Sequence, residues 1–308
     1  MPTTTANGIR IGYEIEGPWD GVPLLLIPGY GQQLVSWPRG LLTGLFERGF
    51  RVVRMDNRDS GASTTFDAFG APPLRPMAMG ALFGLRPAAP YRLEDMADDA
   101  ASLLDALEIP AAHIVGASMG GAIAQLVAAR HAERTLTLTS IMATSGRRFL
   151  SFPKPLAVEA LFQIPASSDV EDLVEHYVEM YRRIGSPMFP ADEAELRRTA
   201  REMYARGFDP RALARQFAAM LASGGDRVPL IRKLRVSTLV IHGSEDPLVP
   251  PDHGEDVARL IPGARIELIE GMGHDLPPGV WTRVTELLAG HCRAVPVTPL
   301  AAASGGFG

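Results

Sequence analysis

One serine in the chain stands where its hydroxyl group could act as a nucleophile. The segment His113-Ile-Val-Gly-Ala-Ser118-Met-Gly-Gly-Ala consists of an apolar strand pattern, a Gly-x-Ser-x-Gly turn and the start of a helix of small residues. A sharp strand-to-helix turn holds such a serine in a strained backbone conformation, which costs roughly 1–3 kcal/mol, and pushes its hydroxyl out above the sheet. Gly116 and Gly120 fit this turn, because a side chain at either position would collide with neighbouring backbone. The pattern therefore predicts Ser118 as a nucleophile.

A serine nucleophile needs a base that accepts its proton and an acid that orients the base. After a turn of this kind, the acid and then the histidine follow the serine along the chain. Asp246 stands just beyond a strand-like Thr-Leu-Val-Ile-His run and a Gly-Ser turn, and His274 stands in a Gly-Met-Gly turn after another strand-like run. Glu245 is the rival acid, and Asp246 is favoured because Pro247 fixes the turn. We expect Asp246 and His274 to complete the group.

The choice of base is open to competition, because the sequence contains seven histidines. His242 and His253 flank the acid loop and remain alternatives to His274. The other histidines lie at ends of the predicted elements, in the central insertion or near the C-terminus: His113, His131, His176 and His291. No His-x-x-x-His or His-Glu-x-x-His spacing occurs, so we expect no metal site.

Two backbone N–H groups are candidates for stabilising the negative oxygen that forms when a serine attacks a carbonyl group. Met119 follows the nucleophile directly, at the positive end of the helix dipole. The second donor comes from a loop after an early strand. The segment Pro28-Gly-Tyr-Gly ends a run of leucines in that place, and its position favours the Tyr30 N–H.

The composition limits the class of protein. A length of 308 residues is enough for one large α/β domain with a smaller insertion, and a formal charge of -5 gives no reason to expect nucleic acid or an anionic membrane as a partner. The N-terminus lacks a secretory pattern, and apolar runs such as residues 22–27 are far too short to cross a bilayer. The single cysteine, Cys292, excludes an internal disulfide. We expect a cytoplasmic protein.

The elements that must position these residues alternate between strand and helix patterns. Residues 9–16 alternate apolar and polar side chains, which predicts an edge strand with one wet face. In residues 93–107 apolar side chains recur every three or four positions, which predicts a helix packed on a core. Short apolar stretches, typical of strands covered on both faces, occur at 22–27, 51–55, 113–115, 136–142, 237–241 and 265–269. The alternation predicts an α/β fold with a mainly parallel, doubly wound sheet.

This alternation is interrupted between two of the strands. Residues 145–235 contain several prolines and helical patterns, of which 170–184 and 191–206 are the clearest, and no convincing strand. We therefore expect an α/β core made of residues 1–144 and 236–292, with residues 145–235 inserted as a helical cap.

Two further segments depart from the regular pattern. Residues 66–90 are rich in Pro, Gly, Met and Phe and are expected to form a long ordered loop, with disorder as the alternative. Residues 293–308 are expected to form a loose tail. A cap above the carboxyl ends of the strands should roof a pocket, and its apolar candidates, with one from the long loop, are Leu161, Phe162, Met180, Tyr181, Met188, Phe189 and Phe83.

Several motifs occur together, in order, across nearly the whole chain, and the series resembles α/β-hydrolase-fold esterases. They are Pro28-Gly-Tyr-Gly31, Asp56-Asn-Arg-Asp-Ser-Gly-Ala-Ser63, Gly116-Ala-Ser-Met-Gly120, Gly243-Ser-Glu-Asp-Pro247 and Gly271-Met-Gly-His274. The chain looks most like the aclacinomycin methylesterase group, whose members cleave a methyl ester from a polyketide. It departs from the family in having Pro28 where many members carry histidine, a longer 66–90 segment and a cap without a matching motif.

The resemblance implies Ser118, Asp246 and His274 as a catalytic triad, with the Tyr30 and Met119 N–H groups as oxyanion donors. It also implies that the loop from Asp56 to Ser63 supports the site, while Arg58 within it could contact substrate. Together with the motifs, it predicts hydrolysis of a small-molecule carboxylic ester through an acyl-enzyme, without a cofactor. The alternatives on the same fold are a lactonase, a carbon–carbon bond hydrolase, a cofactor-free haloperoxidase and a small-molecule receptor with slow turnover. Dehalogenases and epoxide hydrolases resemble this plan with aspartate in place of Ser118, so they are disfavoured.

Overall fold

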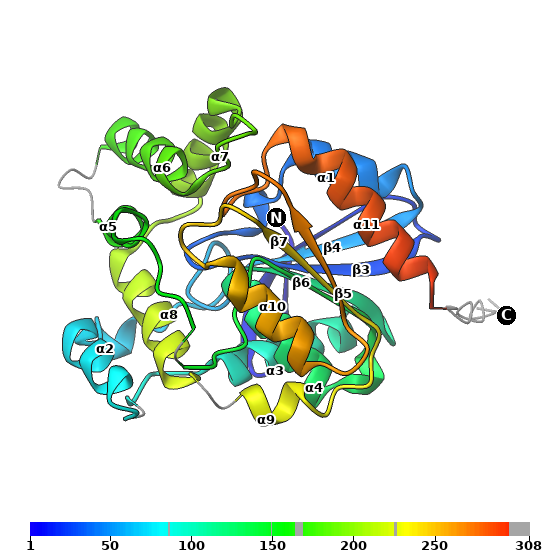
Figure 1. The fold of residues 1–308 in the computed structure, drawn as a ribbon, viewed down its shortest axis with the longest axis horizontal. Coiled ribbons are helices and arrows are strands. Elements are labelled where there is room, and N and C mark those ends of the chain that lie inside the picture. Colours follow the sequence, from blue (N-terminus) through cyan, green and yellow to red (C-terminus); the bar gives the residue numbers. More distant parts are fainter. Residues whose placement is uncertain (86, 149, 164–168, 225–226, 296–308) are drawn as a thin grey trace, which may run out of the picture.

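The computed structural model describes residues 1–85, 87–148, 150–163, 169–224 and 227–295. One eight-stranded sheet runs through its centre in the order β1-β2-β4-β3-β5-β6-β7-β8 (Figure 1). The β1–β2 and β2–β4 pairs are antiparallel, and the remaining neighbours are parallel. This confirms the expected mainly parallel α/β fold. The strands are β1 Thr3–Ala6, β2 Ile9–Glu16, β3 Val22–Ile27, β4 Phe50–Met55, β5 Ala112–Ala117, β6 Thr135–Ile141, β7 Thr238–Gly243 and β8 Arg265–Ile269.

Strand β2 is not the edge strand that the alternating pattern predicted. It pairs with β1 on one side, where Thr3 lies opposite Gly12, and with β4 on the other, where Tyr13 lies opposite Met55. The prediction was wrong because alternation reports which face of a strand is buried, and says nothing about how many neighbours the strand has. The four residues of β1, Thr-Thr-Thr-Ala, are too few to show a period of their own.

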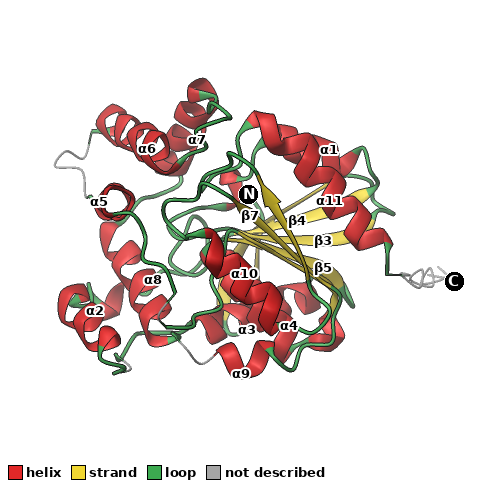
Figure 2. Ribbon diagram, in the orientation of Figure 1, coloured by secondary structure: helices red, strands yellow, loops and turns green. Residues whose placement is uncertain are grey.

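Helices cover both faces of the sheet, so its strands are enclosed as their apolar sequences require (Figure 2). Helices α1 and α11 pack together on one face, and α3, α4 and α10 lie on the other. The core helices are α1 Arg39–Phe46, α3 Leu93–Ala106, α4 Met119–Arg130, α10 Pro251–Leu260 and α11 Trp281–Arg293. Short 3-10 turns lie at Leu34–Ser36, Asp67–Phe69, Ala132–Arg134 and Pro278–Val280.

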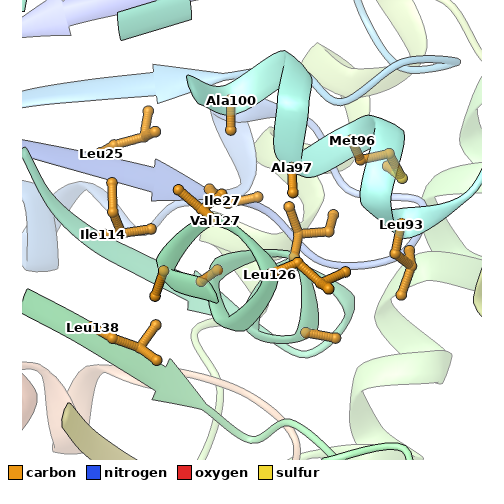
Figure 3. Packing of buried hydrophobic residues seen from close by; sticks show 14 of the residues in the cluster. Leu25, Ile27, Leu93, Met96, Ala97, Ala100, Ile114, Leu126, Val127 and Leu138 are labelled. Atoms are coloured by element: carbon orange, nitrogen blue, oxygen red, sulfur yellow. The ribbon is translucent and has the colours of Figure 1, made fainter. Parts of the chain in front are cut away.

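Helix α4, which follows the candidate nucleophile, lies between the sheet and α3. Figure 3 shows Leu126 and Val127 of this helix beside Ala97 of α3 and Ile114 of β5. Residues 119–128 are all buried, so the helix is enclosed on every side, and apart from Gln125 its buried residues are apolar or glycine. A helix enclosed in this way holds its N-terminus rigidly against the ends of the strands.

The chain between β6 and β7 forms helices α5 to α9, and α5, α6, α7 and α8 lie to one side of the sheet (Figure 1). Asp169, Asp192 and Asp209 begin α6, α7 and α8, because each carboxylate accepts backbone N–H groups of the first turn. Such caps contribute about 1 kcal/mol each. Helix α9 packs against α4. These helices are α5 Pro155–Phe162, α6 Val170–Ile184, α7 Glu193–Ala205, α8 Pro210–Ala222 and α9 Arg227–Ile231.

The 66–90 segment contains a helix that the sequence reading did not foresee, α2 Leu74–Leu82, which packs against α8. Residue 86 lies outside the described part of the segment. Of the expected loose tail, residues 296–308 also lie outside the described residues, and α11 extends to Arg293. Among the described residues, no helix is both long and apolar enough to span a membrane.

Candidate active site

Ser118 sits at the junction of β5 and α4 in the strained conformation that its flanking glycines predicted. Its φ of 55° and ψ of -121° lie in a backbone region that residues other than glycine rarely adopt. Its backbone N–H donates to the Ile141 carbonyl at 2.9 Å, which holds the turn against β6. A Cβ on Gly116 would lie 2.0 Å from the Gly120 oxygen, and one on Gly120 would lie 2.1 Å from the Ile27 oxygen. The two glycines are therefore needed for this turn to close.

The structure brings Ser118, His274 and Asp246 into one chain of hydrogen bonds. The His274 Nε2 lies 3.0 Å from the Ser118 Oγ, and its Nδ1 lies 2.7 Å from the Asp246 Oδ2. The other carboxylate oxygen, Oδ1, accepts the backbone N–H groups of Leu248 and Val249 at 2.9 and 2.8 Å. These two bonds orient the carboxylate so that Oδ2 faces the imidazole. The arrangement allows His274 to accept the serine proton while Asp246 stabilises the resulting imidazolium.

The rival residues lie elsewhere. The His242 Nε2 contacts the Val249 carbonyl at 2.8 Å and stays 3.6 Å from the Asp246 Oδ2, and burial lowers the pKa of this imidazole. His253 bonds the Thr144 hydroxyl and the Ser151 carbonyl. Glu245 is exposed. In the described part of the chain, none of the three hydrogen-bonds Ser118, so His274 and Asp246 are the pair that the fold brings to the serine.

The loop that carries His274 is held by the end of helix α6 rather than by the sheet alone. The His274 N–H donates to the Ile184 carbonyl at 2.8 Å. The Ser186 hydroxyl accepts the Gly273 N–H at 2.9 Å and donates to the Asp275 carboxylate at 2.5 Å. Residues of the 145–235 segment thus hold the loop that carries His274 in place. Sequence reasoning missed this role of Ser186, because no spacing rule links it to a residue so distant along the chain.

Asp275 is a second buried polar group at the site that the sequence did not lead us to expect. It follows His274 directly and is only 6% exposed, yet it lines the cavity at the site. Burial raises the pKa of this carboxyl to about 6, while the Ser186 hydrogen bonds and the charge of His274 act in the opposite direction. Its place beside the base was the available signal in the sequence.

The two predicted oxyanion donors lie beside the serine. A Cβ on Gly29 would come within 3.4 Å of the Ser118 Cβ, so the loop that contains Tyr30 is packed against the turn of the nucleophile. Met119 opens α4, where backbone N–H groups have no partner inside the helix. Within the described residues, neither the Tyr30 nor the Met119 N–H donates to another protein group. Both donors therefore remain available to a substrate oxygen.

A cavity of about 450 Å³ opens at Ser118 and His274. Its walls come from the loops after β3, β5, β6, β7 and β8 and from α5, α6, α7 and α8. Many aliphatic side chains line it, together with seven aromatic ones: Tyr30, Trp37, Phe162, Tyr177, Tyr181, Phe217 and Trp281. Such a cavity suits a largely apolar ligand with a few fixed polar contacts.

Four of the seven apolar candidates line this cavity, namely Leu161, Phe162, Met180 and Tyr181. The other three do not, so the prediction was wrong for them. Phe83 and Met188 are 79% and 63% exposed. Phe189 packs against the core cluster between the sheet, α1 and α11. The sequence could not separate these groups, because an apolar side chain in a cap suits a pocket wall and a packing contact equally well.

Apart from His274 and the tyrosines, the ionisable side chains in the described wall of the cavity are carboxylates, of which that of Glu195 pairs with the exposed Arg198 at 3.4 Å. Asp192, Glu195 and Asp275 line the cavity together with His274, and no Lys or Arg is among its described lining residues. Arg58, which the resemblance left open as a substrate contact, is not in the wall. It is buried in an ion pair with Asp99, with both nitrogen–oxygen distances 2.7 Å. The Asp56–Ser63 loop therefore supports the core at this residue.

Among the described residues, no three or more His, Cys, Asp or Glu side chains lie close enough together to bind a metal ion. The prediction that the chemistry needs no cofactor rests on the residues that surround Ser118 and stays a prediction.

The fold is of the α/β type, and the residues around Ser118 form a candidate active site. The chain belongs to the α/β hydrolase fold family, whose model matches residues 22–277. It is 33% identical over 322 residues to rhodomycin D methylesterase DauP of Streptomyces sp. (strain C5), with 96% of this chain and 100% of that protein covered. These similarities confirm the resemblance to α/β-hydrolase-fold esterases that the motifs suggested.

Two other proteins extend the comparison. The chain is 29% identical over 283 residues to 2-hydroxymuconate semialdehyde hydrolase of Pseudomonas sp. (strain CF600), with 91% of this chain and 87% of that protein covered. Its structure is similar to the enol-lactonase from Burkholderia xenovorans LB400, with a TM-score of 0.70, 22% identity and coverage of 95% and 100%. The second likeness concerns the fold alone.

Proposed function

We propose that this protein hydrolyses carboxylic esters through an acyl-enzyme, with Ser118 as nucleophile, His274 as base and Asp246 as the acid that orients it. The observation that carries the proposal is the hydrogen-bonded chain from Ser118 Oγ through both nitrogens of His274 to Asp246. The similarity to a methylesterase supports an ester as the bond that is cleaved, with methyl esters among the substrates.

The reaction proceeds in two halves. His274 Nε2 takes the Ser118 proton as the Oγ attacks the ester carbonyl. The carbonyl oxygen becomes negative and accepts hydrogen bonds from the Tyr30 and Met119 N–H groups. The His274 imidazolium then donates its proton to the alcohol oxygen as the bond between this oxygen and the carbonyl carbon breaks. The alcohol departs, and the acyl group stays bound to Ser118. Water enters, loses a proton to His274 and attacks the acyl group, and collapse of the second tetrahedral intermediate returns the proton to Ser118. An acid is released.

The cavity indicates which esters fit. Its aromatic and aliphatic walls favour an apolar acyl or alcohol group. Its carboxylates disfavour substrates that carry a free carboxylate, because like charges in a poorly hydrated site repel each other strongly. Burial raises the pKa of the Tyr181 hydroxyl to about 12, so this group adds a polar contact without charge. We propose uncharged apolar esters as the substrate class.

The same proposal gives residues 145–235 the role of a cap above the core formed by residues 1–144 and 236–292. Helices α5 to α8 supply one wall of the cavity, including Phe162 and Phe217, and the loops of the core supply the other. A substrate bound at Ser118 would therefore lie between the two parts. We propose a small-molecule ester as the partner of this site.

The test is steady-state hydrolysis of matched esters by the purified full-length chain at pH 8. p-Nitrophenyl valerate and p-nitrophenyl hemiglutarate have acyl chains of equal carbon number, and only the second carries a carboxylate. We expect sustained turnover, with kcat/KM at least about tenfold higher for the valerate. Ser118→Ala should abolish turnover, and EDTA should leave the rate unchanged. Retained activity in Ser118→Ala would overturn the serine mechanism.

Other outcomes identify the alternatives. A burst of one equivalent of p-nitrophenol that then stalls would indicate a receptor with slow turnover. Hydrolysis of γ- and δ-lactones with higher kcat/KM than of the open-chain valerate would make the protein a lactonase with the same three residues. Preference for the hemiglutarate would contradict the proposed substrate class and leave the mechanism standing.

A further inference from the structure

A glutamine of helix α8 reaches from the cap segment into the loop of the predicted oxyanion donor. The Gln216 Oε1 accepts the Gly31 N–H at 3.0 Å. Its Nε2 donates to the Arg58 carbonyl and to the Ser60 hydroxyl, each at 3.0 Å. The side chain is 1% exposed, and its amide joins the loop after β3 to the loop after β4. All three bonds connect parts of the chain that are distant in sequence.

These bonds bear on one peptide group, the one between Gly29 and Tyr30. Its carbonyl oxygen accepts the Gln32 N–H at 3.2 Å. Because a trans peptide directs its carbonyl and its N–H to opposite sides, the Tyr30 N–H points away from Gln32. The preceding carbonyl, of Pro28, accepts the Asn57 Nδ2 at 3.0 Å. The bond from the Gly31 N–H to Gln216 fixes the next peptide group, between Tyr30 and Gly31. The peptide that carries the Tyr30 N–H is therefore held from both sides.

We propose that Gln216 is a positioning residue that holds the Tyr30 N–H in place for the oxyanion, and this rests on the proposed function. The Gly31 N–H is already used by Gln216, whereas the Tyr30 N–H has no protein acceptor among the described residues. Fixed donors stabilise an oxyanion better than mobile ones, because they need no reorganisation when the charge forms.

The helix that holds the donor also lines the cavity. Phe217 and Met220 of α8 are in the cavity wall, and the Phe217 ring meets the Tyr30 ring edge-on at 6.2 Å between centroids. An acyl group that fits against α8 leaves the Gln216 bond intact, whereas one that displaces the helix also displaces the oxyanion donor. The cap thereby links the fit of the substrate to the rate of the chemical step.

The test is the Gln216→Met variant of the full-length chain, which keeps the length of the side chain and removes its amide. We expect kcat to fall by about 10- to 100-fold, less than the 10²–10³ lost with a whole oxyanion donor, and KM to change by less than about threefold. A trifluoromethyl ketone, which forms a tetrahedral adduct with the serine, should lose affinity by the same factor. The matching methyl ketone should bind as before.

Neighbouring residues provide controls. Phe217→Leu alters the cavity wall and should change KM and the ranking of esters more than kcat. Ser223, at the far end of α8, is buried and bonds the Leu93 N–H and the Glu94 carboxylate, so Ser223→Ala should lower stability with kcat unchanged. If Gln216→Met does not fold, Ser60→Ala takes its place, with a smaller fall in kcat expected.

The outcomes separate this inference from the function on which it rests. If kcat and the affinity for the trifluoromethyl ketone are unchanged in Gln216→Met, or in Ser60→Ala where that variant is used, Gln216 has only a structural role. If both ketones lose affinity equally, the residue shapes the cavity and does not position the donor. If Ser118→Ala remains active, the proposed function itself is wrong.

Discussion

Arg215 and Asp59 form a two-pronged ion pair in the interior, with Nε 2.9 Å from Oδ2 and Nη2 2.8 Å from Oδ1. Both side chains are fully buried, and the Tyr91 hydroxyl donates to the same carboxylate at 2.6 Å. The pair connects α8 with the loop after β4, one residue before Gln216. The helix that lines the cavity and holds the predicted oxyanion loop is thus anchored by a buried charge pair.

Removing the cation should destabilise the protein strongly. Arg215→Met leaves the Asp59 carboxylate buried without its counter-charge, which costs about 3–5 kcal/mol in the free energy of unfolding. Urea titration followed by circular dichroism measures the loss. Adding Asp59→Asn to this variant should recover part of it, since the uncompensated charge is gone. Arg201→Met, which breaks an exposed pair with Glu171, should leave the unfolding midpoint unchanged.

The proposed triad should behave as a unit. Ser118→Ala and His274→Ala should each lower kcat by about 10⁴–10⁶, and the double variant should be hardly slower than either, because each loss disables the same step. Asp246→Asn should cost less, because the histidine remains but with its proton on the wrong nitrogen. Rapid-quench kinetics measure these losses, and additive losses in the double variant would contradict the mechanism.

Asp275 should make stability depend on pH. Its pKa is 3.8 in an ordinary environment and about 6 in the folded protein, so above pH 6 both states are ionised and the folded state bears the full burial penalty. Between about pH 6 and 4 the folded state binds a proton that the unfolded state does not, and the penalty disappears. Asp275→Asn should therefore stabilise the protein by about 1–3 kcal/mol at pH 8 and by little at pH 4.

Chemical denaturation of Asp275→Asn and the parent protein from pH 4 to 8 provides the measurement. The quantity compared is the difference between their free energies of unfolding. Glu255 on α10 is exposed, and Glu255→Gln should follow the parent at every pH. A constant difference between Asp275→Asn and the parent from pH 4 to 8 would show that ionisation of Asp275 is not responsible.

The cavity wall should decide which esters react. Phe162 lines the cavity and meets Phe217 at 4.5 Å between ring centroids, so Phe162→Ala should change the ranking of short and long acyl esters by roughly 1–3 kcal/mol in kcat/KM. Phe189 provides the matched control, because it packs on the core and does not line the cavity. Phe189→Ala should lower the melting temperature and keep the ranking. The reverse pattern would mean that α5 does not set selectivity.

Local features of the sequence were enough to predict the α/β fold and the turn at Ser118. Flanking glycines, an apolar strand and a helix of small residues restrict a few consecutive backbone angles, and such restrictions are written in neighbouring residues. The same applies to the helix at residues 170–184, where the apolar period matches α6. The position of β2 was missed, because strand pairing depends on distant segments.

The approach of His274 to Ser118, rather than of His242 or His253, was decided by tertiary structure, since 156 residues separate the two partners. The role proposed for Gln216 had no sequence signal of its own, and that of Asp275 had only its position beside His274. Gln216 lies in an ordinary helical pattern, and its bond to Gly31 spans 185 residues. Contacts of this range arise only when the sheet, the cap helices and their loops pack together, because a side chain's partner depends on where distant backbone segments lie, and local propensity does not encode that position.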